Sequence, residues 1–202
     1  MLRGSEDGRI LIWEVVGIFF IIVVGSLLHF AYEWAGYSPT VGMFTPVNES
    51  VWEHLKLGFW SLFLYSVMEY WFIRRRAENF FVAKAAGILS LQLLIVAVFY
   101  TYTAFVRREI LAVDIASYVL GAAICQVTAY KILKTRRLPA GLTSVGILFI
   151  VVHAATLIVF TFRPPRLPIL KDPNTGQYGT DWRIERDIHE ENTGSRQGED
   201  SI

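Results

Sequence analysis

The chain has 202 residues, of which 53% are hydrophobic, 14% aromatic and only 18% charged. This composition and the mean hydropathy of +0.41 exclude an ordinary soluble domain and predict an integral membrane protein. The net charge of +1 gives no reason to expect a nucleic-acid partner. The single cysteine, Cys125, excludes an intrachain disulfide bond.

Five apolar stretches approach the roughly 20 residues that a helix needs to cross a bilayer. They cover about residues 10–32, 51–73, 80–105, 110–133 and 142–162. We therefore expect an all-α fold, a polytopic transmembrane bundle of about five helices that forms one domain over residues 1–162. The first stretch follows Arg3 and Arg9 as a signal peptide would, but it carries Glu14 and lacks a cleavage site, so we expect a permanent helix.

Basic residues predict the orientation of the bundle in a cell membrane, because those in short loops stay on the cytoplasmic side. The loop between the first two helices has Glu33 and Glu49 but no Lys or Arg. With Arg107 and Arg108 as exceptions, the pattern predicts a cytoplasmic N-terminus and an extracytoplasmic C-terminal tail. The clusters at the predicted cytoplasmic ends are Arg3 and Arg9; Arg74, Arg75 and Arg76; and Lys131, Lys134, Arg136 and Arg137.

Small and charged residues inside the apolar stretches predict how the helices pack. Small residues on the first and fourth stretches would let neighbouring helices approach closely; they are Gly17, Gly25 and Ser26, and Ser117, Gly121 and Cys125. Charged residues near the predicted cytoplasmic ends would anchor the helices or form ion pairs; they are Glu14, Glu69 and Lys84.

Residues 43–56, between the first two long stretches, hold the densest polar chemistry of the chain. Pro46 ends what precedes it, Asn48 or Ser50 can cap a new helix, and Glu53 follows Ser50 by three residues, which is the spacing of a capping box. His54 shares a helical face with Ser50, and capping does not explain it. We therefore expect this segment to combine a helix start with a functional site.

The tail after residue 162 divides into two parts. Residues 163–182 combine apolar residues with Asp-Pro-Asn-Thr-Gly turn chemistry, which predicts an ordered extracytoplasmic flap. Residues 183–202 are charged and poor in apolar residues, which predicts a disordered tail.

Four titratable groups fall in the outer half of the predicted bundle. They are His29, His54, Asp114 and His153, the last roughly 13 Å from its helix end at 1.5 Å per residue. Such groups in a bilayer usually face a shared interior site, and histidines with a carboxylate are zinc ligands. We expect His29, His54 and His153 to bind zinc and Asp114 or Glu49 to activate water, with Glu49 or Glu53 alternatively orienting a histidine. Ser50 would bond a metal-bound water or an oxyanion. The alternative is that each histidine only bonds a neighbouring helix.

Two motifs carry a resemblance to a known family. Pro-Val-Asn-Glu-Ser-x-Trp-Glu-His-Leu-Lys at residues 46–56 and Asp-Pro-x-Thr-Gly-x-Tyr-Gly at residues 172–179 resemble a prokaryotic family of small multi-pass membrane proteins of unknown function. A looser similarity links Ser50, His54, Asp114 and His153 to the superfamily of alkaline ceramidases and progestin/adiponectin-type receptors. That similarity implies a zinc-dependent membrane hydrolase, although Leu157 stands where a second late histidine is expected.

Three functional hypotheses follow. The first is a metal-dependent hydrolase of lipid amides or esters, with zinc as cofactor and membrane lipids as partners or substrates. The second is a small transporter or an ion- or proton-permeation subunit that uses the same groups. The third is a structural or assembly subunit in which these groups only join helices.

Overall fold

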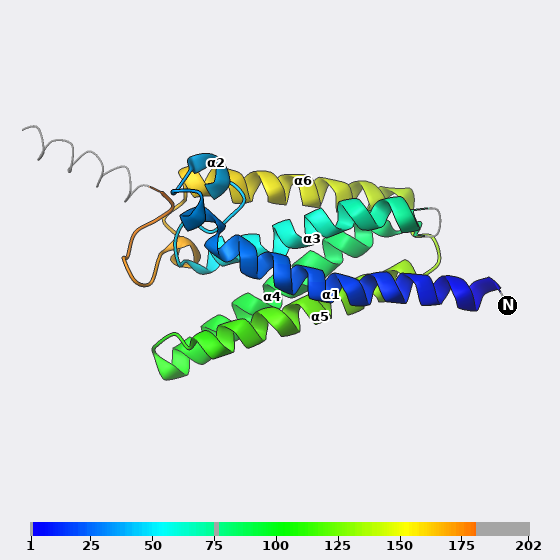
Figure 1. Ribbon diagram of the computed structural model, residues 1–202, viewed down its shortest axis with the longest axis horizontal. Helices are drawn as coiled ribbons and strands as arrows, with labels where there is room; N and C mark the ends of the chain where they lie inside the picture. The colour runs from blue at the N-terminus through cyan, green and yellow to red at the C-terminus, as the bar shows by residue number, and fades with distance from the viewer. Residues whose placement is uncertain (1, 75–76, 181–202) are drawn as a thin grey trace, which may run out of the picture.

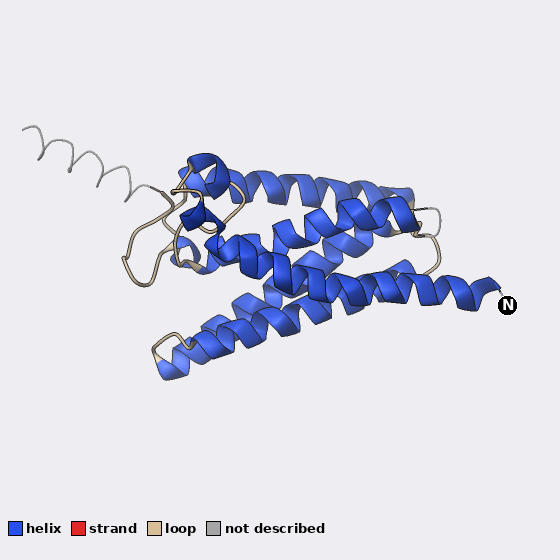
Figure 2. Cartoon of the chain, in the orientation of Figure 1, coloured by secondary structure: helices blue, strands red, loops and turns tan. Residues whose placement is uncertain are grey.

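The computed structural model of the protein describes residues 2–74 and 77–180, with side chains from residue 8 onward. This part of the chain is helical without named strands, which confirms the predicted all-α bundle (Figures 1 and 2). The predicted disordered tail at residues 183–202 lies outside the described residues. The elements are α1 (Leu2–Trp34), α2 (Pro39–Gly42), α3 (Val51–Ile73), α4 (Phe80–Val106), α5 (Leu111–Leu133), α6 (Ala140–Phe162) and the 3-10 helix η1 (Pro168–Leu170).

The five long helices run side by side and alternate in direction (Figure 1). One end of the bundle, here called the N-terminal end, holds the start of α1 and the α3–α4 and α5–α6 connections. The other, here called the flap end, holds residues 35–50, the α4–α5 turn and residues 163–180. Residues 163–180 contain η1 and a single antiparallel bridge between Lys171 and Tyr178.

Four helices in the described part of the chain are long and apolar enough to cross a membrane: Gly8–Trp34 of α1, Phe80–Val106, Leu111–Leu133 and Ala140–Phe162. The sequence analysis expected about five. The remaining helix, α3, is also 23 residues long but carries Glu53, Lys56 and Glu69. It lies at the centre of the bundle, with 13 of its residues buried against 3 in α6. Because α1, α4 and α6 pack around α3, its charged side chains face protein and not lipid.

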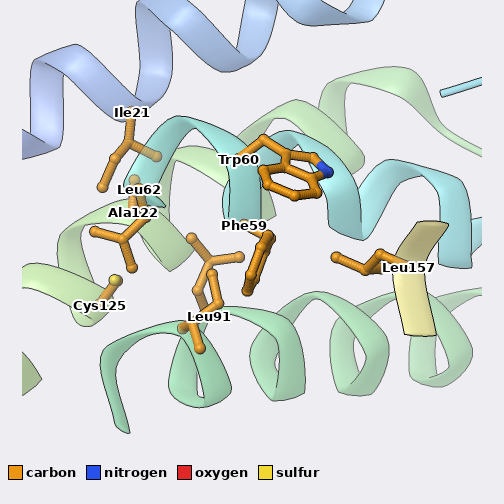
Figure 3. Packing of buried hydrophobic residues seen from close by; sticks show 9 residues of the cluster. Ile21, Phe59, Trp60, Leu62, Leu91, Ala122, Cys125 and Leu157 are labelled. Atoms are coloured by element: carbon orange, nitrogen blue, oxygen red, sulfur yellow. The ribbon is translucent and has the colours of Figure 1, made fainter. Parts of the chain in front are cut away.

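The core lies where the five long helices meet (Figure 3). Ile21 of α1, Phe59 of α3, Leu91 of α4, Cys125 of α5 and Leu157 of α6 all contribute buried side chains to one cluster. Dense packing of this kind fixes the relative positions of helices whose apolar surface would otherwise be interchangeable in lipid.

Close contact between α1 and α5 depends on two glycines. A Cβ atom on Gly17 would lie 1.7 Å from Gln126 Nε2, and one on Gly25 would lie 1.9 Å from the Tyr118 hydroxyl oxygen. That hydroxyl donates a hydrogen bond to the Ile21 carbonyl at 2.8 Å. A hydrogen bond therefore joins α5 to α1 at the place where Gly25 has no side chain. The prediction that Gly17 and Gly25 permit close helix approach is confirmed.

Three charged side chains near the N-terminal end form a buried ion cluster, here called the triad. Lys84 Nζ lies 2.8 Å from Glu14 Oε1 and 2.6 Å from Glu69 Oε2, so the cluster joins α4, α1 and α3. The predicted ion pairing is confirmed, but the three side chains lie inside the bundle and not at a lipid interface.

Candidate functional site

Residues 43–50 lead from α2 into α3, and Ser50 is the N-cap of α3. Its Oγ accepts a hydrogen bond from the Glu53 backbone N–H at 3.3 Å, which confirms the predicted cap. Ser50 N–H donates to Asn48 Oδ1 at 2.9 Å, and the Glu53 carboxylate accepts from Val47 N–H at 3.0 Å. The Ser50 side of the predicted capping box therefore forms, whereas the glutamate is directed one turn further back into the loop.

Lys56 explains why the Glu53 side chain points back into the loop. No role for Lys56 was predicted from the sequence. Its ammonium group is fully buried and lies 2.6 Å from Glu53 Oε2. This group ties the loop before α3 to the end of α6, because its other acceptors come from both. They are Thr161 Oγ1 at 2.6 Å, the Gly42 carbonyl at 2.9 Å and the Thr45 carbonyl at 3.2 Å.

Residues 172–180 pack directly on this loop. Asp172 is buried; its Oδ1 accepts two N–H groups of its own turn, and its Oδ2 accepts Glu49 N–H at 3.3 Å. The Asn48 side-chain amide donates to the Gly179 carbonyl at 3.1 Å. The two motifs that the sequence analysis singled out are therefore in contact, and each holds the other in place.

Three of the predicted site residues come together at the flap end. His29 of α1, His54 of α3 and Glu49 of the loop each offer one ligand atom, and these atoms lie within 4.8 Å of one another. The two imidazole centroids are 5.2 Å apart, and His54 Nε2 lies 3.4 Å from Glu49 Oε2. The His54 and Glu49 side chains are 31% and 51% exposed, so the group is accessible from the surface.

The hydrogen bonds of the two histidines favour metal binding. His54 Nδ1 lies 3.0 Å from the Ser50 carbonyl, which can only accept, so Nδ1 carries the hydrogen. In the neutral ring the Nε2 lone pair is then free on the Glu49 side, as it is in metal-binding histidines held by a backbone carbonyl. His29 Nδ1 is buried and has no hydrogen-bond partner. Among the described residues, His29 therefore has a ring nitrogen without a protein partner, and the group beside His54 Nε2 is the Glu49 carboxylate, itself a candidate ligand.

His153 lies apart from this group. Its ring stacks on Phe149, with centroids 5.4 Å apart and an interplanar angle of 6°, and lies 5.2 Å from Phe59 and 6.3 Å from Trp52. Within the described residues, the structure thus gathers two histidines and one carboxylate, and it does not bring the three predicted histidines together.

The two other predicted catalytic residues have separate environments. Asp114, in the first turn of α5, accepts the Tyr102 hydroxyl at 2.8 and 3.0 Å, and it lies close enough to His54 for their charges to interact. Ser50 Oγ is fully buried and occupied by the helix cap. Asp114 therefore remains available to the site, whereas Ser50 contributes through its carbonyl.

Glu109, in the α4–α5 turn, is a further acidic group near the site that the sequence analysis missed. Burial raises its pKa, and the nearby Asp114 raises it further, while His54 acts in the opposite direction. Glu49 and Asp172 also interact with it. The sequence signal for Glu109 is its position in a loop at the same end of the bundle as His29 and His54.

Residues 6–180 match the model of a family described as "Family of unknown function (DUF6512)". The match covers most of the chain, so the protein belongs to this family, in agreement with the predicted membership of an uncharacterised family. No curated protein and no solved structure matches the chain.

Proposed function

We propose that this protein is a zinc-dependent membrane hydrolase that cleaves an amide or ester bond of a lipid at the flap end. The observation that carries the proposal is the meeting of His29, His54 and Glu49, whose ligand atoms lie within 4.8 Å of one another. Two histidines and one glutamate, with a fourth position left to water, form one of the known ligand sets of catalytic zinc.

The distances support this ligand set. Tetrahedral zinc with bonds of about 2.1 Å separates its ligands by about 3.4 Å. The 3.4 Å between His54 Nε2 and Glu49 Oε2 meets this requirement, and a small rotation of His29 would complete it. Zinc in such a site supplies a hydroxide at neutral pH. His29, His54 and Glu49 would bind the ion, with the Ser50 carbonyl orienting His54.

Asp114 and Glu109 are the candidate proton acceptors beside the ion. Both interact electrostatically with His54; Glu109 belongs to the α4–α5 turn and Asp114 to the first turn of α5. The raised pKa of Glu109 brings its proton exchange closer to neutral pH, where a general acid or base works best.

A lipid substrate is supported by where the group lies. His29 is five residues before the end of a helix long enough to span a bilayer, so the site is near one membrane surface. The basic clusters at the N-terminal end favour the extracytoplasmic surface for the flap end. The loose sequence resemblance of Ser50, His54 and Asp114 to the alkaline ceramidase superfamily would imply the same substrate class.

The first test is the metal content of the detergent-purified protein, measured by mass spectrometry with folding checked by circular dichroism. We expect about one zinc per chain in the wild type. Folded His29→Ala, His54→Ala and Glu49→Ala variants should lose it, and His153→Ala should keep it. Absence of zinc from the wild type, or equal loss in His153→Ala, would contradict the proposed ligand set.

The second test is hydrolysis of lipid amides and esters by the zinc-loaded protein in vesicles. Activity should disappear in His54→Ala and fall at least about 100-fold in Asp114→Asn if Asp114 accepts the proton. Hydrolysis that persists in a zinc-free His54→Ala protein would show that the activity does not use this site.

A further inference from the structure

The triad at the N-terminal end has an unusual charge balance. Glu14, Glu69 and Lys84 are each at most 3% exposed, and they bring two carboxyl groups to one ammonium group. If all three were ionised, one negative charge would remain uncompensated in the buried interior of the bundle. Such a charge is costly, and two carboxylates that share a buried site do not both ionise readily. The site therefore calls for one additional positive charge.

The carboxyl oxygens indicate where that charge would be held. Glu14 Oε2 and Glu69 Oε1 are buried and have no hydrogen-bond partner. The two carboxyl groups also lie close enough to interact directly with each other. One proton on either group would turn an unpartnered acceptor into a donor and cancel the excess charge.

The groups around the triad provide no other cation. From α3, the Tyr65 hydroxyl donates to the Trp13 carbonyl, and from α5, Gln126 Nε2 donates to the Glu14 carbonyl at 3.2 Å. The Cys125 thiol of α5 is also near the three charges. Among the described residues that face the triad, Lys84 is thus the only cationic side chain.

A cavity of about 310 Å³ lies between α3, α4 and α6, and it reaches one member of the triad, Lys84. Lys84 lines it, and so does Ser66, whose buried hydroxyl has no hydrogen-bond partner. Val67 and Trp71, which also line it, are 50% and 65% exposed. The lining is mostly apolar, and its side chains with polar atoms are Ser66, Tyr70, Trp71 and Lys84.

We propose that the triad is a proton-binding site in which Glu14 and Glu69 share one exchangeable proton. On release, the carboxyl O–H bond breaks and the proton passes to a water molecule that enters through the cavity lined by Lys84, leaving a second carboxylate. Uptake is the reverse. Each exchange changes the charge between α1, α3 and α4 by one, far along α3 from His54. The proposal does not depend on the zinc site.

Infrared difference spectroscopy of the full-length wild type in vesicles tests the proposal directly, because a protonated carboxyl group has its own C=O band. The titration runs from about pH 6 to about pH 9, where an ordinary glutamate is ionised throughout. We expect a band from about one carboxyl per chain that shifts in D₂O and disappears as the pH rises. If no such band appears over this range, both glutamates are ionised and the proposal fails.

Two variants and one control assign the band. Glu14→Gln and Glu69→Gln each leave one carboxylate opposite Lys84, so each should abolish the band in a folded protein. Glu33→Gln changes an exposed carboxylate and should keep it. A band that survives both triad variants would refute the assignment. If NaCl stabilises the protein against unfolding more than choline chloride does, and no carboxyl band appears, the site holds Na⁺ and not a proton.

Discussion

The described residues of the bundle include two buried ion clusters that differ in charge balance and in hydrogen bonding. At the flap end, one carboxylate faces one ammonium, and Lys56 Nζ has four oxygen partners within 3.2 Å. At the N-terminal end, two carboxyl groups face the Lys84 ammonium, and an oxygen of each has no partner. Both clusters involve α3, and the charged side chains of both are buried.

The difference separates a structural joint from an exchangeable site. Lys56 and Glu53 balance each other in charge and bond the backbone around them, so the pair needs no further proton or cation for charge balance. In the triad, an oxygen of each carboxyl group has no hydrogen-bond donor, and one added proton would supply a donor and cancel the excess negative charge. Burial alone does not predict function in a membrane bundle; the count of charges and of unused hydrogen-bonding atoms distinguishes the two clusters.

The same Glu→Gln substitution in each cluster should test the difference between them most clearly. Glu53→Gln leaves the buried Lys56 ammonium without a carboxylate, and we expect a loss of about 3 kcal/mol in unfolding free energy. Glu69→Gln mimics a protonated glutamate and should cost less than about 1 kcal/mol at pH 7. Thermal unfolding in detergent measures both. Equal losses would mean that the two clusters have the same charge balance.

Packing around the triad can be tested separately from its charges. Gly17→Ala would place a methyl group against Gln126 and Tyr65, which bond the backbone of α1 beside the triad. We expect a loss of about 1–3 kcal/mol in thermal unfolding. Gly141→Ala is the matched control, since nothing lies within 4 Å of its added Cβ. If both variants unfold together with the wild type, α1 and α5 do not pack this closely.

The contacts of the flap-end loop should give the smallest effect. Asp172→Ala removes an acceptor from Glu49 N–H and from two N–H groups of its own turn, which should cost about 1–2 kcal/mol. Hydrogen exchange at residues 172–176 should speed up, and zinc affinity should fall about 10-fold as Glu49 loses its support. Lys171→Ala, at an exposed neighbour, should change neither. Unchanged exchange in Asp172→Ala would contradict the contact.

The sequence predicted the helices closely and the contacts between them only in part. The stretch expected at residues 51–73 is α3 itself, because Ser50 and the basic residues after Ile73 mark its ends. The depth of a residue along its helix also follows from the sequence, since each residue lengthens a helix by about 1.5 Å. His29 and His54 were therefore placed at the same level, and they are neighbours.

Rotation about the helix axis could not be predicted in the same way. A helix that is apolar all round has no polar face to show which side meets which neighbour. His153 was consequently assigned to the metal group, although its ring faces Phe149 and Phe59. For the same reason the sequence did not reveal the role of Lys56, whose hydrogen-bond acceptors lie 11, 14 and 105 residues away along the chain.

The hydrogen bond between Asn48 and Gly179 spans 131 residues. The loop that carries Glu49 is synthesised early, yet its last partners are made only after all the long helices. The loop therefore lacks these contacts until the later helices have entered the membrane. Metal loading at His29, His54 and Glu49 would then be a late event, which keeps an incompletely assembled chain from displaying a finished site.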